Sequence, residues 1–556
     1  MFLPRLPLLA LLSVLSLTPK LMAQQSGTPS PQADPASQPA MAQQNGPNGQ
    51  QPSAATATNT ITQNVRLVAL DAVVLDSKGN AVSGLQASDF HITEDGEPQT
   101  IRNFDAPGKY EVPQGASIES TADLDRVAPR APVNIILLDE FNTRFEDMAF
   151  ARYSLKKWLE KQPDVLPSPT MLIAVDLQHF TVLRDYTQNK DEILQALDHH
   201  FVAYPWQVHQ GAWVAERYST ALLSLRRVAE AVIGHQGHKT MIWVGRGFPT
   251  LNWAHVPADQ NRMVNSAIQV TINQLRDARV TLYTVDPAGV MIDPGVYGNA
   301  ARDFASFGGD PDFQALARAT GGRNLYGRND VDAEIGTSIR DGSSFYSFSY
   351  RPTNVSTDVQ KFRKIKVTVD HPGLTGLTVV TRQGYYPDRL PVRPTADGKA
   401  GRNLSAELEG ASQSNMVYDA VRFSVDALPE DHSNVILTVD GRGLSWYFAT
   451  DTSPRHTRLI IMLTYFDKKG KELKQDGKRI DFPAKPGAPA TGHFDQTLKF
   501  KFPVAPDAKT TRARFVVRVE STGRMGTLDV DVNNGVLSSA TMDPVAAQPA
   551  AVSATP

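Results

Sequence analysis

Residues 133–143 read VNIILLDEFNT, and this stretch decides the fold of the chain. Its first six residues are almost continuously apolar, which is typical of a strand buried on both faces of a sheet. The apolar run ends at Asp139, where acidic and polar residues begin. The stretch therefore predicts a central strand whose end carries chemistry-bearing side chains.

Strands and helices alternate downstream of this stretch. Apolar runs predict further buried strands at 171–175, 240–244 and 280–285. Between them, apolar residues recur every three or four positions, as in 148–159, which indicates helices with one buried face. We therefore expect an α/β, Rossmann-like domain with a doubly wound, mainly parallel sheet covered by helices on both faces.

The residues before this domain predict a small β module at 61–106. Turn signals at 76–80 and 94–97 separate short apolar runs, which is a hairpin pattern. So short a module rarely folds alone, and we expect it to pack on the α/β domain. The polar residues 107–132, bounded by prolines, predict a linker.

Strand patterns return after the α/β domain. Alternating apolar and polar residues from 344 to 386 predict strands appended to that domain, which then spans 133–387. Residues 388–403 carry Pro, Arg and Gly and predict a second linker. From 404 to 539, short alternating strands predict an all-β region that folds as a two-sheet β-sandwich.

Both ends of the chain have the composition of segments without a core. In 1–23, Arg5 precedes an apolar run, which is typical of a cleaved secretory signal peptide, an uncut membrane anchor being the alternative. Residues 24–60 and 540–556 are poor in large apolar side chains and predict a disordered tether and tail. We expect a bacterial protein that is extracytoplasmic, either periplasmic or secreted, with no integral membrane span after signal cleavage.

Composition excludes several function classes. The chain of 556 residues has no cysteine, which excludes disulfides, thiolate metal sites and a cysteine nucleophile. Lys and Arg total 56 against 58 Asp and Glu, so charge makes no case for a nucleic-acid partner. Neither a His-Glu-x-x-His nor a Gly-x-Ser-x-Gly motif occurs. We expect a protein that is not an enzyme.

Some charged side chains are expected in solvent. His235 and His238 fall in a predicted helix-to-strand turn, which favours a solvated loop over a metal site. Lys499 and Lys501 alternate with apolar residues on one predicted strand, and Arg514 does so on another. This alternation predicts solvated strand faces.

Four stretches occur in order along the chain: DAVVLDSKGNAVSGLQASDFHITEDGEPQTI at 71–101, IILLDEFNT at 135–143, LARATGGR at 316–323 and FRKIKVTV at 362–369. Together they resemble the von Willebrand factor type A (VWFA)-related proteins that are abundant in acidobacteria. The resemblance covers roughly 61–387. It implies a type A-like domain that binds other proteins, often through a divalent cation at the C-terminal edge of the sheet.

The cation motif that the resemblance implies is incomplete here. Its first part, Asp-x-Ser-x-Ser, corresponds to Asp139 and Thr143, whereas Phe141 replaces the middle serine and Asn142 lies one position late. Where the family usually has an aspartate after a later strand, this chain has Arg246, whose charge disfavours a cation. We predict a degenerate site without a cofactor, and Mg²⁺ or Ca²⁺ held by Asp139 and Thr143 stays open as the alternative.

The sequence therefore predicts a non-enzymatic protein–protein interaction or adhesion-type protein. Its candidate binding residues are Asp139, Asn142, Thr143 and Arg246, at the edge where parallel sheets place ligands. A rival hypothesis is an extracytoplasmic hydrolase or a glycan-binding protein that uses the C-terminal β-sandwich. The sequence identifies neither the protein ligand nor the oligomeric state.

Overall fold

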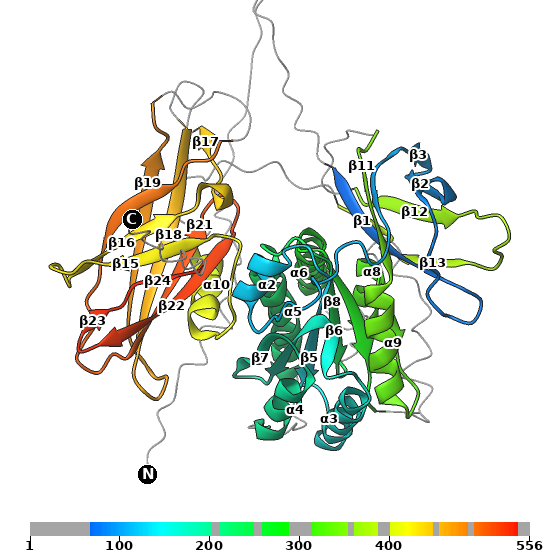
Figure 1. Cartoon of the computed structure of the whole chain (residues 1–556), viewed down its shortest axis with the longest axis horizontal. Coiled ribbons are helices and arrows are strands. Elements are labelled where there is room, and N and C mark those ends of the chain that lie inside the picture. Colours follow the sequence, from blue (N-terminus) through cyan, green and yellow to red (C-terminus); the bar gives the residue numbers. More distant parts are fainter. Residues whose placement is uncertain are drawn as a thin grey trace, which may run out of the picture. The chain divides into compact units, whose positions relative to one another are not determined.

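The computed structural model describes residues 67–202, 212–248, 258–288, 313–353, 361–386, 401–448, 455–486 and 494–542 (Figure 1). The predicted signal peptide (1–23) and tether (24–60) lie outside these ranges, as does most of the linker predicted at 388–403. Within them the chain is a mixed α/β structure with five sheets, one of which is mainly parallel. No helix in the described ranges is long and apolar enough to cross a membrane.

The mainly parallel sheet has six strands in the order β10-β9-β8-β5-β6-β7. Only β6 and β7 pair antiparallel; β7 was not predicted from the sequence. The strands are β5 (Val133–Asp139), β6 (Val165–Val175), β7 (Phe180–Asn189), β8 (Lys239–Val244), β9 (Val280–Val285) and β10 (Asn324–Leu325). Because β5 lies in the middle, the direction of winding reverses between β5 and β8, which makes their C-terminal ends a topological switch point.

Helices cover both faces of this sheet. Successive side chains of a strand point to opposite faces, so Ile135 and Leu137 of β5 belong to one core, and Ile136 and Leu138 to the other. The first core is completed by α5 (Ala212–Val232), α6 (Ala258–Asp277) and α8 (Phe313–Thr320). The second is completed by α3 (Phe145–Glu160), α4 (Lys190–His199) and α9 (Val331–Ser343).

Residues 107–132 do not form a simple linker. They contain α2 (Thr121–Val127), which begins after Ser120, whose hydroxyl accepts a hydrogen bond from a backbone N–H of the first turn. Leu124 is buried in the first core, and Asp185 of β7 accepts a hydrogen bond from the first N–H of α2 at 2.8 Å. Isolated apolar residues among polar ones hid this helix in the sequence.

The β module predicted at 61–106 is half of a larger one. β1 (Val68–Leu75) pairs with β11 (Phe345–Tyr350) and β13 (Thr378–Thr381), and β2 (Phe90–Glu94) pairs with β12 (Arg363–Val369). The remaining strands are β3 (Glu97–Gln99), β4 (Ile101–Asp105) and β14 (Gly384–Tyr385). They complete two four-stranded sheets around one core, so Figure 1 shows β1, β2 and β3 beside β11, β12 and β13.

This pairing corrects the boundaries predicted for the α/β domain. The strands after residue 344 are not appended to that domain but belong to the β module, and the α/β region is inserted between β4 and β11. Alternation of apolar and polar residues identifies a strand and its buried face, but not its partner. For that reason the prediction of one domain over 133–387 was wrong.

The C-terminal region begins with a helix, although 404–539 was predicted to be all β. Helix α10 (Gly401–Gln413) crosses the predicted boundary. Its residues Leu408 and Ala411 are buried in the first core of the α/β region. Leu404, Leu408 and Ala411 recur at helical spacing, so the sequence does carry a signal for this helix.

Two antiparallel sheets follow α10. The first contains β15 (Phe423–Ala427), β16 (Asn434–Val439), β20 (Leu498–Pro503) and β24 (Ala540–Thr541). The second contains β17 (Tyr447–Phe448), β18 (Arg455–Phe466), β19 (Glu472–Pro483), β21 (Arg512–Val519), β22 (Met525–Asn533) and β23 (Val536–Leu537). Both sheets contribute side chains to one core. Since β24 pairs with β15, the first residues of the tail predicted at 540–556 are ordered, and those beyond 542 lie outside the described ranges.

Helix α10 changes the environment of one strand face. Lys499 and Lys501 are exposed as predicted, but Arg514 is 1% exposed. The Arg514 guanidinium donates to the carbonyl oxygens of Ala411, at 3.0 Å, and Met416, and it pairs with Asp529. The expectation of a solvated Arg514 was therefore wrong, because an unpredicted helix covers its face of β21.

Two carboxylates meet where α10 packs on α5. Burial, together with the nearby Glu407, raises the pKa of Glu230 to about 7, and Gln274 donates a hydrogen bond to Glu230 at 3.0 Å. A raised pKa in the folded state favours the protonated form, so this stabilising contribution is lost as pH rises through about 7. We expect Glu230→Gln to stabilise the protein, relative to the wild type, more at pH 8 than at pH 5. The difference in the free energy of unfolding should be on the order of 1–2 kcal/mol.

Urea unfolding at both pH values measures this difference. Glu409→Gln, on the exposed side of α10, is the matched control and should leave the pH dependence of stability unchanged. Equal pH profiles for the wild type and Glu230→Gln would contradict the expectation.

Candidate functional site

The candidate site lies where β5 and β8 end side by side. Leu138 and Val244 are paired residues of these parallel strands, so the loops that follow them meet at the C-terminal edge of the sheet. The four residues predicted from the sequence, Asp139, Asn142, Thr143 and Arg246, all belong to these two loops or to the strand end. This is the topological switch point, where open α/β sheets bind ligands.

The Asp139 carboxylate accepts three hydrogen bonds within the site. Its Oδ1 accepts from the Asn142 backbone N–H at 2.9 Å, and its Oδ2 accepts from Trp243 Nε1 at 3.0 Å and the Gly247 N–H at 2.7 Å. Burial raises the pKa of Asp139 to about 7, whereas these three donors and the nearby Arg217 favour the charged form. The side chain is fully buried, so it joins the two loops and does not reach a partner.

Asn142 and Thr143 also point inward. The Asn142 side chain donates to the Gly247 carbonyl oxygen and accepts from the guanidinium of Arg217. The Thr143 hydroxyl accepts from the Arg246 backbone N–H at 3.3 Å. Both side chains are buried, and their contribution to binding can only be to shape the loop.

Two glycines allow the second loop to pass this close. Gly247 has φ +71°, and a Cβ there would lie 2.1 Å from Phe313 Cδ1. A Cβ at Gly245, where φ is +145°, would lie 2.4 Å from Asp139 Cβ. Only glycine fits both the backbone conformation and the space. The Gly-Arg-Gly sequence is therefore a steric requirement of the loop that carries Arg246.

Arg246 is the member of the predicted set that reaches solvent, with 26% of its side chain exposed. Its guanidinium lies between Asp147 of α3, at 4.0 Å, and Asp286 after β9, at 3.8 Å. Burial raises the pKa of Asp147, and Arg246 opposes that shift. Neither aspartate was predicted from the sequence, although Asp286 directly follows β9, which ends at this edge.

The residues present do not fit a hard divalent cation. Such a cation needs several oxygen ligands in open positions, but the oxygens of Asp139, Asn142 and Thr143 already accept hydrogen bonds from N–H groups. Arg217 is also buried beside them, and burial lowers its pKa to about 10. No group of three His, Asp or Glu suited to a metal occurs among the described residues.

Two exposed aromatic side chains lie at helix ends near the C-terminal edge of the sheet. Phe145, at the start of α3, is 54% exposed, and Phe201, just after α4, is 81% exposed. His200 places that end of α4 at the C-terminal edge, because its Nε2 lies 2.8 Å from the Oε1 of Glu140. Single exposed apolar side chains are common on protein surfaces, so these two residues add to the candidate site only through their position at this edge.

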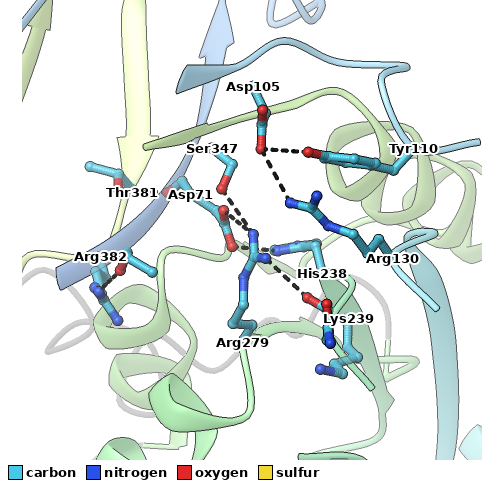
Figure 2. A network of polar contacts seen from close by, with 12 residues as sticks. Asp71, Asp105, Tyr110, Arg130, His238, Lys239, Arg279, Ser347, Thr381 and Arg382 are labelled. Atoms are coloured by element: carbon cyan, nitrogen blue, oxygen red, sulfur yellow. Dashed lines mark hydrogen bonds and ion pairs between the residues drawn. The ribbon is translucent and has the colours of Figure 1, made fainter. Parts of the chain in front are cut away.

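A second polar cluster lies at the opposite edge of the sheet, where β8 and β9 begin (Figure 2). Arg279 donates to Asp71 of β1 at 2.8 Å and to Ser347 of β11 at 2.9 Å. His238 Nδ1 lies 2.8 Å from the second Asp71 oxygen. His238 and His235 are each 3% exposed, so the prediction that they are solvated was wrong. This cluster joins the β module to the α/β region.

Lys239 extends the cluster towards the C-terminal region. Its buried ammonium donates to the carbonyl oxygens of His235 and Ala278, and burial, aided by Arg279, lowers its pKa to about 7. Burial also raises the pKa of Asp419, which accepts from the Gly234 N–H at 3.0 Å, to about 8. Because these groups are buried and form hydrogen bonds with backbone groups of the protein, we interpret this edge as a structural junction.

Comparisons with known proteins identify no family. No family model matches the sequence, and no curated protein matches it either. Among solved structures, the chain is similar to the pilus adhesin SpaC of Lactobacillus rhamnosus GG, with 10% sequence identity and a TM-score of 0.24. That match covers 83% of this chain and 58% of the adhesin, and so low a TM-score carries no argument about fold or function.

Proposed function

We propose that this chain is an exported, non-enzymatic protein that binds another protein through the C-terminal edge of its parallel sheet. The observation that carries the proposal is the placement of Arg246: a partly exposed guanidinium that lies between Asp147 and Asp286 at the topological switch point. The sequence resemblance to VWFA-related proteins supports a type A-like domain here. It also gives a reason to expect a protein ligand.

The buried residues of the site would act by holding Arg246 in place. Asp139 bonds the backbone of both loops, and Thr143 bonds the Arg246 N–H itself. A preorganised loop loses little conformational freedom on binding, which favours affinity. Arginine and aromatic side chains dominate the energetics of protein interfaces, and Phe145 and Phe201 supply aromatic surface at this edge.

The proposal also holds that recognition is independent of metal. In this view the cation site of the VWFA-related pattern is degenerate, and the positive charge at the edge belongs to Arg246. We further interpret the two C-terminal sheets, which share one core, as a β-sandwich.

Charge reversal at Arg246 tests the proposal. Purified wild type, Arg246→Glu and Arg442→Glu are each used as bait for envelope proteins of the source organism, with and without EDTA. Arg442 is the matched control because it is exposed and paired with Asp440, far along the sequence in the C-terminal region. We expect Arg246→Glu to reduce recovery of the partner at least tenfold, and Arg442→Glu and EDTA to leave it unchanged.

Two results would contradict the proposal. One is equal recovery of the partner by Arg246→Glu, provided that its melting temperature matches the wild type. The other is turnover of a glycan or ester substrate without any protein partner, which would favour the hydrolase hypothesis.

A further inference from the structure

A cavity of about 500 Å³ lies beside α9, apart from the loops that carry Arg246. One wall is a single face of α9, with Ala333, Thr337 and Arg340 at helical spacing. The other walls are Leu325 of the edge strand β10 and the turn after β1, which includes Lys78. Two regions that are distant in the sequence thus build one cavity.

The junction at the base of the sheet holds these two walls together. Arg279 and His238 bond Asp71, which lies on the same strand that leads into the Lys78 turn. The turn itself is ordered, because Asp76 accepts hydrogen bonds from the Lys78 and Asn80 N–H groups at 2.8 Å. The Lys78 backbone is therefore fixed opposite α9.

The charges on the cavity wall are mainly positive. Four basic residues line it, and two of them are neutralised: Arg323 pairs with Asp341 at 2.7 Å, and Arg328 pairs with Asp330. The other two are Lys78 and Arg340. Neither forms an ion pair with any residue in the described ranges, and Arg340 donates only to the Thr337 hydroxyl, at 2.9 Å.

Glu334 is the other acidic residue on the wall. Both of its carboxylate oxygens are buried, and neither has a hydrogen-bond partner among the described residues. Burial and the nearby Asp330 raise the pKa of Glu334 to about 7, so near neutral pH it carries less than a full negative charge. Lys78 and Arg340 therefore leave a net positive charge in the cavity.

We propose that this cavity binds a small ligand that bears an oxyanion, and that Lys78 and Arg340 hold its phosphate, sulfate or carboxylate group. The volume lies within the range of small-molecule sites. Charged and polar side chains dominate the lining, which suits a polar ligand. Charge-assisted hydrogen bonds from the two cations would supply most of the affinity.

Isothermal titration calorimetry at low ionic strength tests this proposal with inorganic phosphate, sulfate and citrate as probes. We expect saturable binding of at least one probe to the wild type, and the strongest probe identifies the oxyanion class. In Lys78→Gln/Arg340→Gln the affinity should fall at least tenfold. The matched control Arg442→Gln/Lys499→Gln removes the same charge from exposed positions and should bind within twofold of the wild type.

Three outcomes would overturn the proposal. They are no saturation by any probe, undiminished binding by the Lys78→Gln/Arg340→Gln variant, or heats that sodium chloride reproduces at equal ionic strength. Circular dichroism checks that each variant is folded. If the double variant does not fold, Arg340→Gln alone, at an exposed helix position, replaces it in the titration. The assay uses no protein partner, so its result is independent of the proposed function.

Discussion

Asp139→Ala is expected to lower the free energy of unfolding by about 3–5 kcal/mol. The substitution leaves three N–H donors, from Asn142, Trp243 and Gly247, buried without an acceptor. Each abandoned donor costs about 1–3 kcal/mol, partly relieved by relaxation of the loops. The charge of buried Arg217 also loses a nearby carboxylate. Urea unfolding at neutral pH measures the loss.

Asp147→Ala is the control for this substitution. It removes a carboxylate that faces Arg246 across 4.0 Å near the surface, and about 1 kcal/mol or less should be lost. Equal losses for Asp139→Ala and Asp147→Ala would show that the buried hydrogen bonds are not what stabilises the loops.

Asp139→Ala, together with Thr143→Val, tests the proposed degenerate cation site. Millimolar Mg²⁺, Mn²⁺ or Ca²⁺ should leave the melting temperature of the wild type unchanged, because a ligand that does not bind the folded state cannot stabilise it. A rise in the wild type that disappears in Asp139→Ala and in Thr143→Val would show that the site holds a metal.

Arg279→Met is expected to cost about 3–5 kcal/mol, because it leaves the Asp71 carboxylate buried with its main cation removed. Although burial opposes the shift, Arg279 and then His238 hold the pKa of Asp71 well below its usual range. A lowered pKa contributes stability that is present above the ordinary pKa of aspartate and lost as pH falls below about 4. In Arg279→Met the pKa of Asp71 should rise, so the loss of stability that Asp71 causes at low pH should become smaller.

Arg130→Met, in the same view of Figure 2, is the matched control. Arg130 is half exposed and lies 3.8 Å from Asp105, so its removal should cost no more than about 1 kcal/mol. A double-mutant cycle with Asp71→Asn should give a coupling energy of at least about 1 kcal/mol with Arg279→Met. Additive losses would mean that the pair does not join the two regions.

Much of the α/β region could be predicted from the sequence because its signals are local. The apolar run that ends at Asp139 indicates a strand buried on both faces, and β5 is indeed central in the sheet. The pairing of β1 with β11 could not be predicted, since both strands show the same alternation whichever partner they have. Arg514 shows the same limit: its burial depends on α10, a separate element.

The candidate site, too, could be predicted only in part from the sequence. Strand ends and topology place Asp139 and Arg246 at one edge, so their proximity was predictable. The direction of each side chain was not, because it depends on Arg217 and Trp243, which come from other elements. The cations Lys78 and Arg340 carried no sequence signal at all, since their shared cavity exists only after β1 docks beside α9.

Strands of the β module lie on both sides of the α/β insertion in the sequence, so the module cannot be completed until the whole insertion has been synthesised. β1 and β2 are synthesised first, yet their partners β11, β12 and β13 come only after the entire α/β insertion. The insertion can fold as soon as α9 is available, and once folded it holds β4 and β11 close enough to shorten the remaining loop closure. Until then β1 lacks both of its partners and β2 has only β3, and unpaired apolar strand edges are prone to aggregation. If the chain crosses a membrane N-terminus first, residues 67–105 are the segment that chaperones and proteases meet during biogenesis.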